Sequence, residues 1–277
     1  MTVSDLLLQD RTLIMGVLNV TPDSFSDGGA YLDPEKAIAQ ALRMAKEGAD
    51  IIDIGGESSR PGAEPVSVME EIRRVLPVIT ALQKQIDIPI SIDTYKASVA
   101  EEALKAGAQL INDITGLRGD DRMVQLAAEY DVYTVIMHMK GTPRTMQHNP
   151  NYENLMEELV QFFMKQVAFA LATGINRGKI IIDPGIGFGK RVEDNFIILN
   201  ELQKLVEIGY PVLVGPSRKS FIGKTLHLPV EERLEGTSAA VTAAILNGAK
   251  IVRVHDVKEM RRVVLITDAI RLERVDA

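Results

Sequence analysis

Polar side chains that can recognise a heterocycle stand near the ends of apolar segments in this sequence. Asp183 follows the isoleucines of KIIIDPG, Asp93 follows those of IPISIDT, and Asn112 lies in QLINDI. A buried carboxylate can accept two N–H bonds from an amidine-like edge, and an asparagine offers both a donor and an acceptor. Together they predict a pocket for a ring with mixed donors and acceptors. The alternative is that these residues cap turns and helices, for which Asp and Asn are equally suited.

Basic residues occupy corresponding positions late in the sequence. Lys219 and Ser220 flank a predicted helix start in GPSRKSFIG, where free backbone N–H groups favour an anion. Arg253 and His255 alternate in KIVRVH, so their side chains point the same way along a strand. Such a pair late in a barrel is typical of a phosphate-binding site. A solvated basic turn at Lys219 and a structural role for His255 are the alternatives.

Asn19, which precedes the segment Thr21-Pro22-Asp23, is a candidate ligand for a hard cation. A magnesium ion that bridges a diphosphate needs only one or two oxygen ligands from the protein. Asn19 can equally serve to fix the loop backbone. The chain has no cysteine, which excludes thiolate metal sites.

These residues are distant in sequence, so repeated elements have to bring them together. Eight apolar runs each end in a polar or Gly-rich cluster and precede a segment with helical periodicity. The runs are 13–19, 51–57, 88–94, 109–114, 132–138, 179–185, 211–219 and 250–255. Three helix-to-strand links repeat a Gly-Ala pattern, in EGADIIDI, AGAQLINDI and NGAKIVRV, and glycine there suits a left-handed helix cap.

The repeated strand–helix units predict an α/β protein with a (β/α)8 TIM barrel, in a single domain over residues 1–277. Continuous apolar strands are covered on both faces, as parallel strands are. In such a barrel the carboxyl ends of all strands meet at one mouth, so the polar residues above would share a pocket. A doubly wound open sheet is the alternative, although no G-x-G-x-x-G sequence follows the first strand.

Three strand-to-helix connections are long and rich in Gly, Pro, Ser and Asp. They span 20–33, 55–65 and 139–152, and all fall on the predicted mouth. Connections of this length in a compact domain are commonly functional lids or binding loops. We therefore expect loops that cover the pocket.

Composition limits the possible partners and location. The net charge of −7 without a basic block disfavours a nucleic-acid surface. No apolar run reaches the length of about 20 residues that a membrane-spanning helix needs. The N-terminal MTVSDLLLQD lacks the basic flank and apolar core of a signal peptide. We expect a cytoplasmic protein that binds small molecules and neither nucleic acid nor membrane.

The motifs as a set resemble those of the dihydropteroate synthase family. The resemblance is carried by GVLNVTPDSFSDGG (16–29), IDIGGESSRPGA (52–63), ISIDTYK (90–96), INDITG (111–116), DPGIGFGK (183–190), GPSRKSFIG (215–223) and RVHDV (253–257). It covers essentially the whole chain in family order. It implies a folate-pathway transferase that joins 6-hydroxymethyl-7,8-dihydropterin diphosphate to 4-aminobenzoate, releasing diphosphate. It also implies a TIM barrel, Mg²⁺ as cofactor, a homodimer and a target of sulfonamides.

The resemblance also implies roles for individual residues. The positions matching the family's pterin pocket are Asp93, Asn112, Asp183 and Lys219. Those matching the diphosphate and metal site are Asn19, Arg253 and His255, with Asn19 as the metal ligand. Those matching the two loops and the wall around aminobenzoate are Asp23, Phe25, Ser59, Arg60, Pro61, Phe188 and Ser220. Catalytic roles fall to Asp23, Lys219, Arg253 and His255.

Two other readings remain at this point. A pterin-binding barrel can instead transfer a methyl group from methyltetrahydrofolate to a cobalamin partner, but such proteins are expected to lack the NVTPDSFSDGG and SSRPG loops. A non-enzymatic pterin-binding barrel would keep Asp183 and Asn112 without needing Arg253 and His255. Release of diphosphate in the presence of aminobenzoate would distinguish the first of these from the family reaction.

Overall fold

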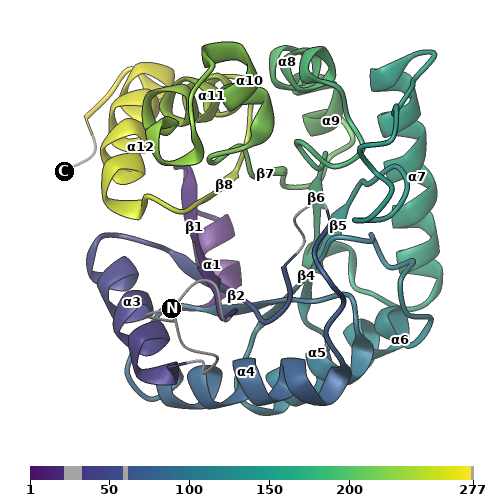
Figure 1. Ribbon diagram of the computed structural model, residues 1–277, viewed down its shortest axis with the longest axis vertical. Helices are drawn as coiled ribbons and strands as arrows, with labels where there is room; N and C mark the ends of the chain where they lie inside the picture. The colour runs from purple at the N-terminus through teal and green to yellow at the C-terminus, as the bar shows by residue number, and fades with distance from the viewer. Residues whose placement is uncertain (22–32, 59–61, 276–277) are drawn as a thin grey trace.

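A computed structural model describes residues 1–21, 33–58 and 62–275. Its eight strands are all parallel and run in the order β6-β5-β4-β3-β2-β1-β8-β7 around a barrel (Figure 1). The strands are β1 (Leu13–Asn19), β2 (Ile51–Gly55), β3 (Ile90–Asp93), β4 (Leu110–Asp113), β5 (Tyr133–Met137), β6 (Ile180–Asp183), β7 (Leu213–Val214) and β8 (Ile251–Val254). Each predicted apolar run contains one of them.

The sheet closes on itself between β6 and β7. A single parallel bridge joins Ile182 to Val212, and the Ile182 N–H donates to the Pro211 carbonyl at 3.0 Å. With β1 paired to both β2 and β8, the strands form a nearly closed ring. The predicted TIM barrel is therefore confirmed, and the open doubly wound alternative is wrong.

Helices form a ring around the strands (Figure 1). They are α3 (Pro34–Lys46), α4 (Val68–Leu82), α5 (Ala97–Lys105), α6 (Arg122–Glu129), α7 (Leu155–Ala172), α8 (Val192–Asn200), α9 (Gln203–Val206), α10 (Ser220–Leu226), α11 (Leu234–Leu246) and α12 (Val257–Leu272). In α3 the N-terminal cap is Asp33, whose carboxylate accepts from the Glu35 and Lys36 N–H groups, satisfying donors that the first turn leaves unpaired. Ala41 of α3 and Ile79 of α4 are both fully buried, as the helical periodicity predicts.

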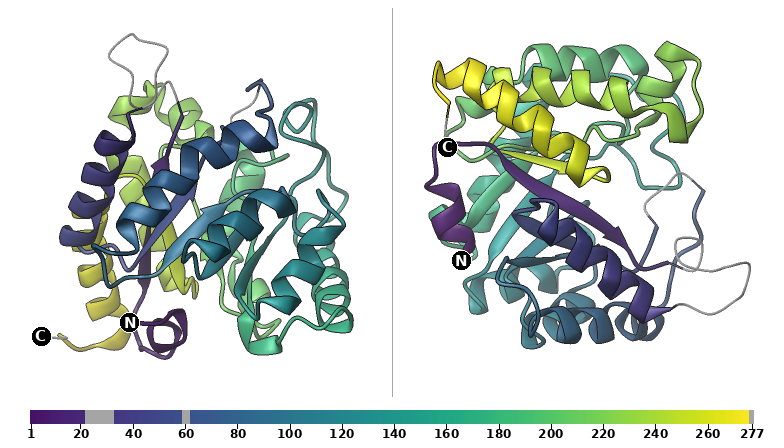
Figure 2. Two further views of the ribbon diagram at one scale, coloured as in Figure 1. Left: turned by 90° about the horizontal axis from the view of Figure 1, so that it is seen from below. Right: turned by 90° about the vertical axis from the view of Figure 1, so that its left-hand side faces the viewer.

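The interior of the barrel is apolar where the strands begin. Side chains of alternate strand residues form one cluster there, and the short helix α1 (Val3–Leu7) places Val3 and Leu6 against it. Figure 2 shows α1 across this end of the barrel. Leu6 is 0% exposed, so α1 seals the floor of the barrel. Any pocket must open at the other end, where the strands finish.

None of the helices in the described ranges is long and apolar enough to cross a membrane.

Candidate active site

Four polar side chains at the upper end of the barrel are joined by hydrogen bonds. The Oδ2 atom of Asp53, on β2, accepts from Asn112 Nδ2 at 2.9 Å and from Arg253 Nε at 2.6 Å. The other side of the guanidinium, Arg253 Nη2, donates to Asp93 Oδ2 at 2.6 Å. Strands β2, β3, β4 and β8 thus each contribute one side chain to a polar floor that lies one layer above the apolar cluster.

The charges on this floor are balanced locally. Burial alone would lower the pKa of Arg253, but the carboxylates of Asp53 and Asp93 raise it above its usual range. Burial also raises the pKa of Asp93 to about 7, against the opposing influence of Arg253. Burial without partners would be strongly unfavourable for each of these ions. Their pairing lets a charged group sit at the base of the pocket.

Thr94, and not Asp93, caps the turn that follows β3. The Lys96 N–H donates to Thr94 Oγ1 at 3.2 Å, so the Asp93 carboxylate is left to pair with Arg253. The capping alternative raised for Asp93 by the sequence is therefore wrong.

Asp183 ends β6 and combines the two roles that the sequence left open. Its Oδ1 atom accepts from the Gly185 N–H at 2.7 Å, which is the turn-capping role. Within the described part of the chain, its Oδ2 atom accepts no hydrogen bond and can face a ligand. Burial raises the pKa of Asp183 to about 6, although the Gly185 N–H and Lys219 oppose that shift.

The loop after Asp183 depends on glycine. Gly185 has φ +67°, and a Cβ there would lie 2.1 Å from the His138 carbonyl oxygen. A side chain at Gly185 would thus combine left-handed backbone strain with a collision against backbone. The loop next to the site can follow this path only with glycine at that position.

Lys219 lies in the segment between β7 and α10, and its side chain packs against this loop. Its Nζ is 4.1 Å from the centre of the Phe188 ring, and its Cδ lies close enough to Gly187 that a Cβ there would sit 3.3 Å away. Burial and the nearby Arg253 lower the pKa of Lys219 to about 8, against the opposing effects of Asp183 and Asp93. Lys219, predicted for the pterin pocket, and Phe188, predicted for the wall around aminobenzoate, thus lie side by side.

The remaining predicted residues occupy the rim of the barrel. Asn19 is the last residue of β1, His255 follows β8, and Ser220 begins α10 with Lys219 as the N-cap. His255 Nδ1 lies 3.0 Å from the Ser217 hydroxyl, and burial together with Arg253 lowers the pKa of His255 to about 3. At neutral pH the ring is uncharged, so it can donate one hydrogen bond but contributes no positive charge.

Known enzymes have a similar sequence and the same fold. The pterin-binding enzyme family matches residues 15–255. A dihydropteroate synthase of Bacillus subtilis is 50% identical over 266 residues, which is 96% of this chain and 91% of that protein. The chain belongs to the dihydropteroate synthase family.

Solved structures of the dihydropteroate synthase family superpose on this chain over nearly its full length. The Clostridium difficile enzyme, crystallised in the presence of pteroic acid, gives a TM-score of 0.88 at 50% identity and covers 94% of this chain and 97% of its own. The Yersinia pestis enzyme, in complex with a sulfonamide drug, gives a TM-score of 0.91 at 45% identity and covers 96% of both chains. The predicted family and enzyme class are confirmed, and the methyl-transfer and non-enzymatic alternatives are not supported.

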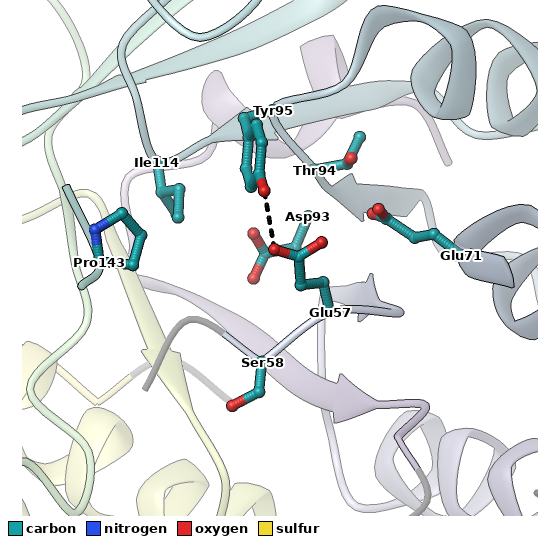
Figure 3. A pocket seen from close by; sticks show the side chains of 8 residues that line it. All are labelled: Glu57, Ser58, Glu71, Asp93, Thr94, Tyr95, Ile114 and Pro143. Atoms are coloured by element: carbon teal, nitrogen blue, oxygen red, sulfur yellow. Dashed lines mark hydrogen bonds between the residues drawn. The ribbon is translucent and has the colours of Figure 1, made fainter. Parts of the chain in front are cut away.

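A small pocket lies beside Asp93 (Figure 3), lined by Glu57, Ser58, Glu71, Asp93, Thr94, Tyr95, Ile114 and Pro143. The Tyr95 hydroxyl donates to Glu57 Oε1 at 2.7 Å. Lys96 donates to Glu57, to Glu71 Oε2 at 2.6 Å and to the Val66 carbonyl at 2.7 Å. Glu57 and Val66 flank the connection between β2 and α4, so one lysine holds both of its ends next to the site.

Sequence reasoning missed Asp53 and a buried pair behind the glycine loop. Asp53 lies inside an apolar run and not at its end, although a carboxylate in such a run is itself a signal. Lys190 Nζ contacts His138 Nδ1 and the Phe188 carbonyl, each at 3.0 Å, and burial lowers the pKa of Lys190 to about 7. This lysine ties the loop that carries Phe188 to the end of β5.

Several predicted loop residues lie outside the described ranges. These are Asp23, Phe25, Ser59, Arg60 and Pro61.

Proposed function

We propose that this protein condenses 6-hydroxymethyl-7,8-dihydropterin diphosphate with 4-aminobenzoate to give 7,8-dihydropteroate and diphosphate, with the polar floor of the barrel as the pterin site. The observation that carries the proposal is the meeting of Asp183, Asn112 and Arg253 in one barrel mouth. Acidic and amide groups suit the amino-pyrimidinone edge of a pterin, and cations suit its diphosphate. Pteroic acid, present with the Clostridium difficile enzyme, contains both joined halves of that product.

The pterin ring would be recognised by Asp183, Asn112 and Asp93. Asp183 Oδ2 suits a pair of ring and exocyclic N–H donors. The Oδ1 atom of Asn112 is buried and accepts no hydrogen bond from the described residues, so a ligand donor would satisfy it. A wrong heterocycle would leave such groups unpaired at a cost of about 1–3 kcal/mol each. Selection for a pterin follows from that cost.

The diphosphate would lie at the rim over Arg253, His255 and Lys219. Arg253 and Lys219 supply positive charge, and His255 supplies a neutral N–H donor. These groups stabilise negative charge as it develops on the leaving group, an effect that often dominates enzymatic rate enhancement. The methylene C–O bond breaks as diphosphate departs with the electron pair. The arylamine nitrogen then forms the new C–N bond and loses a proton.

Departure of diphosphate would run ahead of attack. The dihydropterin ring is electron-rich and can delocalise positive charge from the methylene carbon, and the described site presents carboxylates, an amide and cations in place of an activated nucleophile. The amine of 4-aminobenzoate is neutral at pH 7, so attack needs no strong base. Asp23, on the loop outside the described ranges, would stabilise the cationic carbon.

Phe188, Ser220 and the loop residues Phe25, Ser59, Arg60 and Pro61 would enclose 4-aminobenzoate. Phe188 supplies an apolar face beside Lys219, and Ser220 supplies a hydroxyl at the start of α10. A sulfonamide drug bound by the Yersinia pestis enzyme shares the aniline-like shape of this substrate. Closed loops would also exclude water, which competes for a reactive carbon.

The residues present fit a magnesium ion only as a partner of the diphosphate. Among the described residues, no group of three His, Cys, Asp or Glu side chains has the arrangement of a metal site. Mg²⁺ retains waters and phosphate oxygens as ligands and needs few protein oxygens, a requirement that the Asn19 amide oxygen meets. When bound, Mg²⁺ would supply charge neutralisation for the leaving diphosphate.

A homodimer is the proposed assembly. Its support is a set of apolar side chains left exposed on helices of the outer ring, among them Met164 and Phe169 of α7 and Phe196 of α8. A second copy of the chain packed on these helices would remove such side chains from water. Light scattering should give twice the chain mass, whereas the mass of one chain would contradict the proposal.

The proposed reaction is tested by product formation. Purified protein is incubated with the pterin diphosphate, 4-aminobenzoate and Mg²⁺, and 7,8-dihydropteroate is measured by mass spectrometry together with released diphosphate. We expect the two products in equal amounts, and no dihydropteroate from the Asp183→Asn variant. Release of diphosphate without dihydropteroate would show a hydrolase and contradict the proposal.

A further inference from the structure

Asp53 connects the two halves of the polar floor. It lies in the middle of β2 and its side chain is 0% exposed. One oxygen atom, Oδ2, accepts from both Asn112 and Arg253, which come from β4 and β8. Those two side chains are the ones assigned above to the pterin ring and to the diphosphate. A single buried acceptor therefore fixes the relative positions of both recognition elements.

Arg253 has two carboxylate partners in unequal environments. Its Nε side contacts Asp53, which is fully buried, and its Nη2 side contacts Asp93, whose side chain is 13% exposed. Asp93 lies at the end of β3, where a bound pterin would compete for the same carboxylate, whereas Asp53 lies in the middle of β2 and is fully buried. The Asp93 contact is thus open to exchange, while the Asp53 contact is shielded.

We propose that Asp53 is a positioning residue that fixes Asn112 and the Nε side of Arg253, while the Nη2 side of Arg253 passes from Asp93 to the diphosphate when the pterin binds. The inference rests on the proposed function. Ring N–H donors take over the Asp93 carboxylate, and the released guanidinium N–H groups gain an anion with several oxygens. Recognition of the ring and of the diphosphate then reinforce each other, because each one favours the same rearrangement.

The exchange is tested on the unaltered protein by calorimetry. Inorganic diphosphate is titrated at fixed Mg²⁺ with and without saturating 6-hydroxymethylpterin, which carries no diphosphate. We expect diphosphate to bind about 10-fold more tightly when the pterin is present. Equal or weaker binding would overturn the exchange. A protein that binds both ligands cooperatively but forms no dihydropteroate would instead contradict only the proposed function.

The positioning role is tested with Asp53→Asn, which keeps the shape and removes the charge. The matched control is Ser91→Ala on β3, because Ser91 is the register neighbour of Asp53, is fully buried and has an unpartnered hydroxyl among the described residues. We expect Asp53→Asn to raise the KM for pterin diphosphate by about 10-fold or more and to weaken 6-hydroxymethylpterin binding, since bonds to charged groups are the stronger ones. The KM for 4-aminobenzoate should be unchanged, and Ser91→Ala should bind both ligands normally.

A purely structural role predicts a different outcome. Asp53→Asn would then lower Tm and leave the KM for pterin diphosphate and the affinity for 6-hydroxymethylpterin at their original values, which would overturn the assignment. If Asp53→Asn does not fold, Asp53→Ser is measured with the same expectations, because serine also removes the charge and its shorter side chain withdraws the oxygen that Asn112 and Arg253 share.

Discussion

Replacing Asp183 with asparagine should remove pterin binding while leaving the fold in place. In the structure Asp183 Oδ1 already accepts from the Gly185 N–H at 2.7 Å. The amide introduced by Asp183→Asn would have to keep its oxygen on that N–H, so its NH2 group would point where the ligand places its own donors. The substitution therefore exchanges an acceptor for a donor at the position that reads the ring.

The size of the effect follows from that exchange. One charge-assisted hydrogen bond is lost, worth about 1.5–3 kcal/mol, and a buried donor is left facing another donor, at about 1–3 kcal/mol. The sum of about 2.5–6 kcal/mol corresponds to a loss of roughly 70- to 25,000-fold in affinity at 25 °C. The assay is calorimetry with 6-hydroxymethylpterin, which isolates the ring from the diphosphate contacts.

Asp50→Asn is the matched control for Asp183→Asn. Asp50 is also buried and accepts from Arg11 and from the Ile14 N–H, but it lies where β2 begins, at the sealed end of the barrel. The Asp50→Asn substitution should lower the free energy of unfolding and leave pterin affinity unchanged. The reasoning is refuted if Asp183→Asn binds the ring as tightly as the original protein, or if both variants lose affinity equally.

Three further predictions concern pH, the barrel floor and the glycine loop. Because burial raises the pKa of Asp183 to about 6, pterin affinity measured by calorimetry should fall as the pH drops below that value. The same raised pKa means that the folded state binds this proton more tightly than the unfolded state does, so the stability contributed by the protonated form is lost as pH rises through about 6. Urea unfolding should show that Asp183→Asn gains stability relative to the original protein as the pH rises from about 4 to about 6. A constant difference in stability between the two proteins would contradict the shift. Leu6→Ala should lower the free energy of unfolding by about 2–5 kcal/mol, since Leu6 is fully buried in the lower cluster, with the KM values of the remaining folded enzyme unchanged. Gly185→Ala should reduce kcat/KM for pterin diphosphate far more than Gly178→Ala, because a Cβ at Gly185 meets the His138 carbonyl whereas one at Gly178 comes no closer than 3.7 Å to any neighbour; equal effects would show that the loop can adjust.

The sequence predicts the barrel because two periodicities agree along the whole chain. Apolar runs give the strands, and helical spacing between them gives the outer layer. The boundaries are less predictable. The run at 211–219 contains a strand of only two residues, Leu213–Val214, because the chain there turns toward Lys219 as soon as the barrel has closed.

The candidate site is predictable to the level of residue identity but not of partners. Asp93, Asn112 and Asp183 lie at the carboxyl ends of strands and Lys219 is the N-cap of α10, and the barrel alone makes such positions functional. Which of them pair with which depends on how the strands are staggered around the barrel, and a linear sequence does not contain that information. Arg253 illustrates the limit, because the sequence suggests a cation facing a phosphate and the structure shows it held by Asp53 and Asp93.

The most direct test of the account is a crystal structure with the pterin diphosphate bound. The account predicts the pterin edge on Asp183 and Asn112, with the diphosphate oxygens on Arg253 at the rim of the same mouth. A pterin bound elsewhere on the barrel, or a diphosphate with no contact to Arg253, would contradict it.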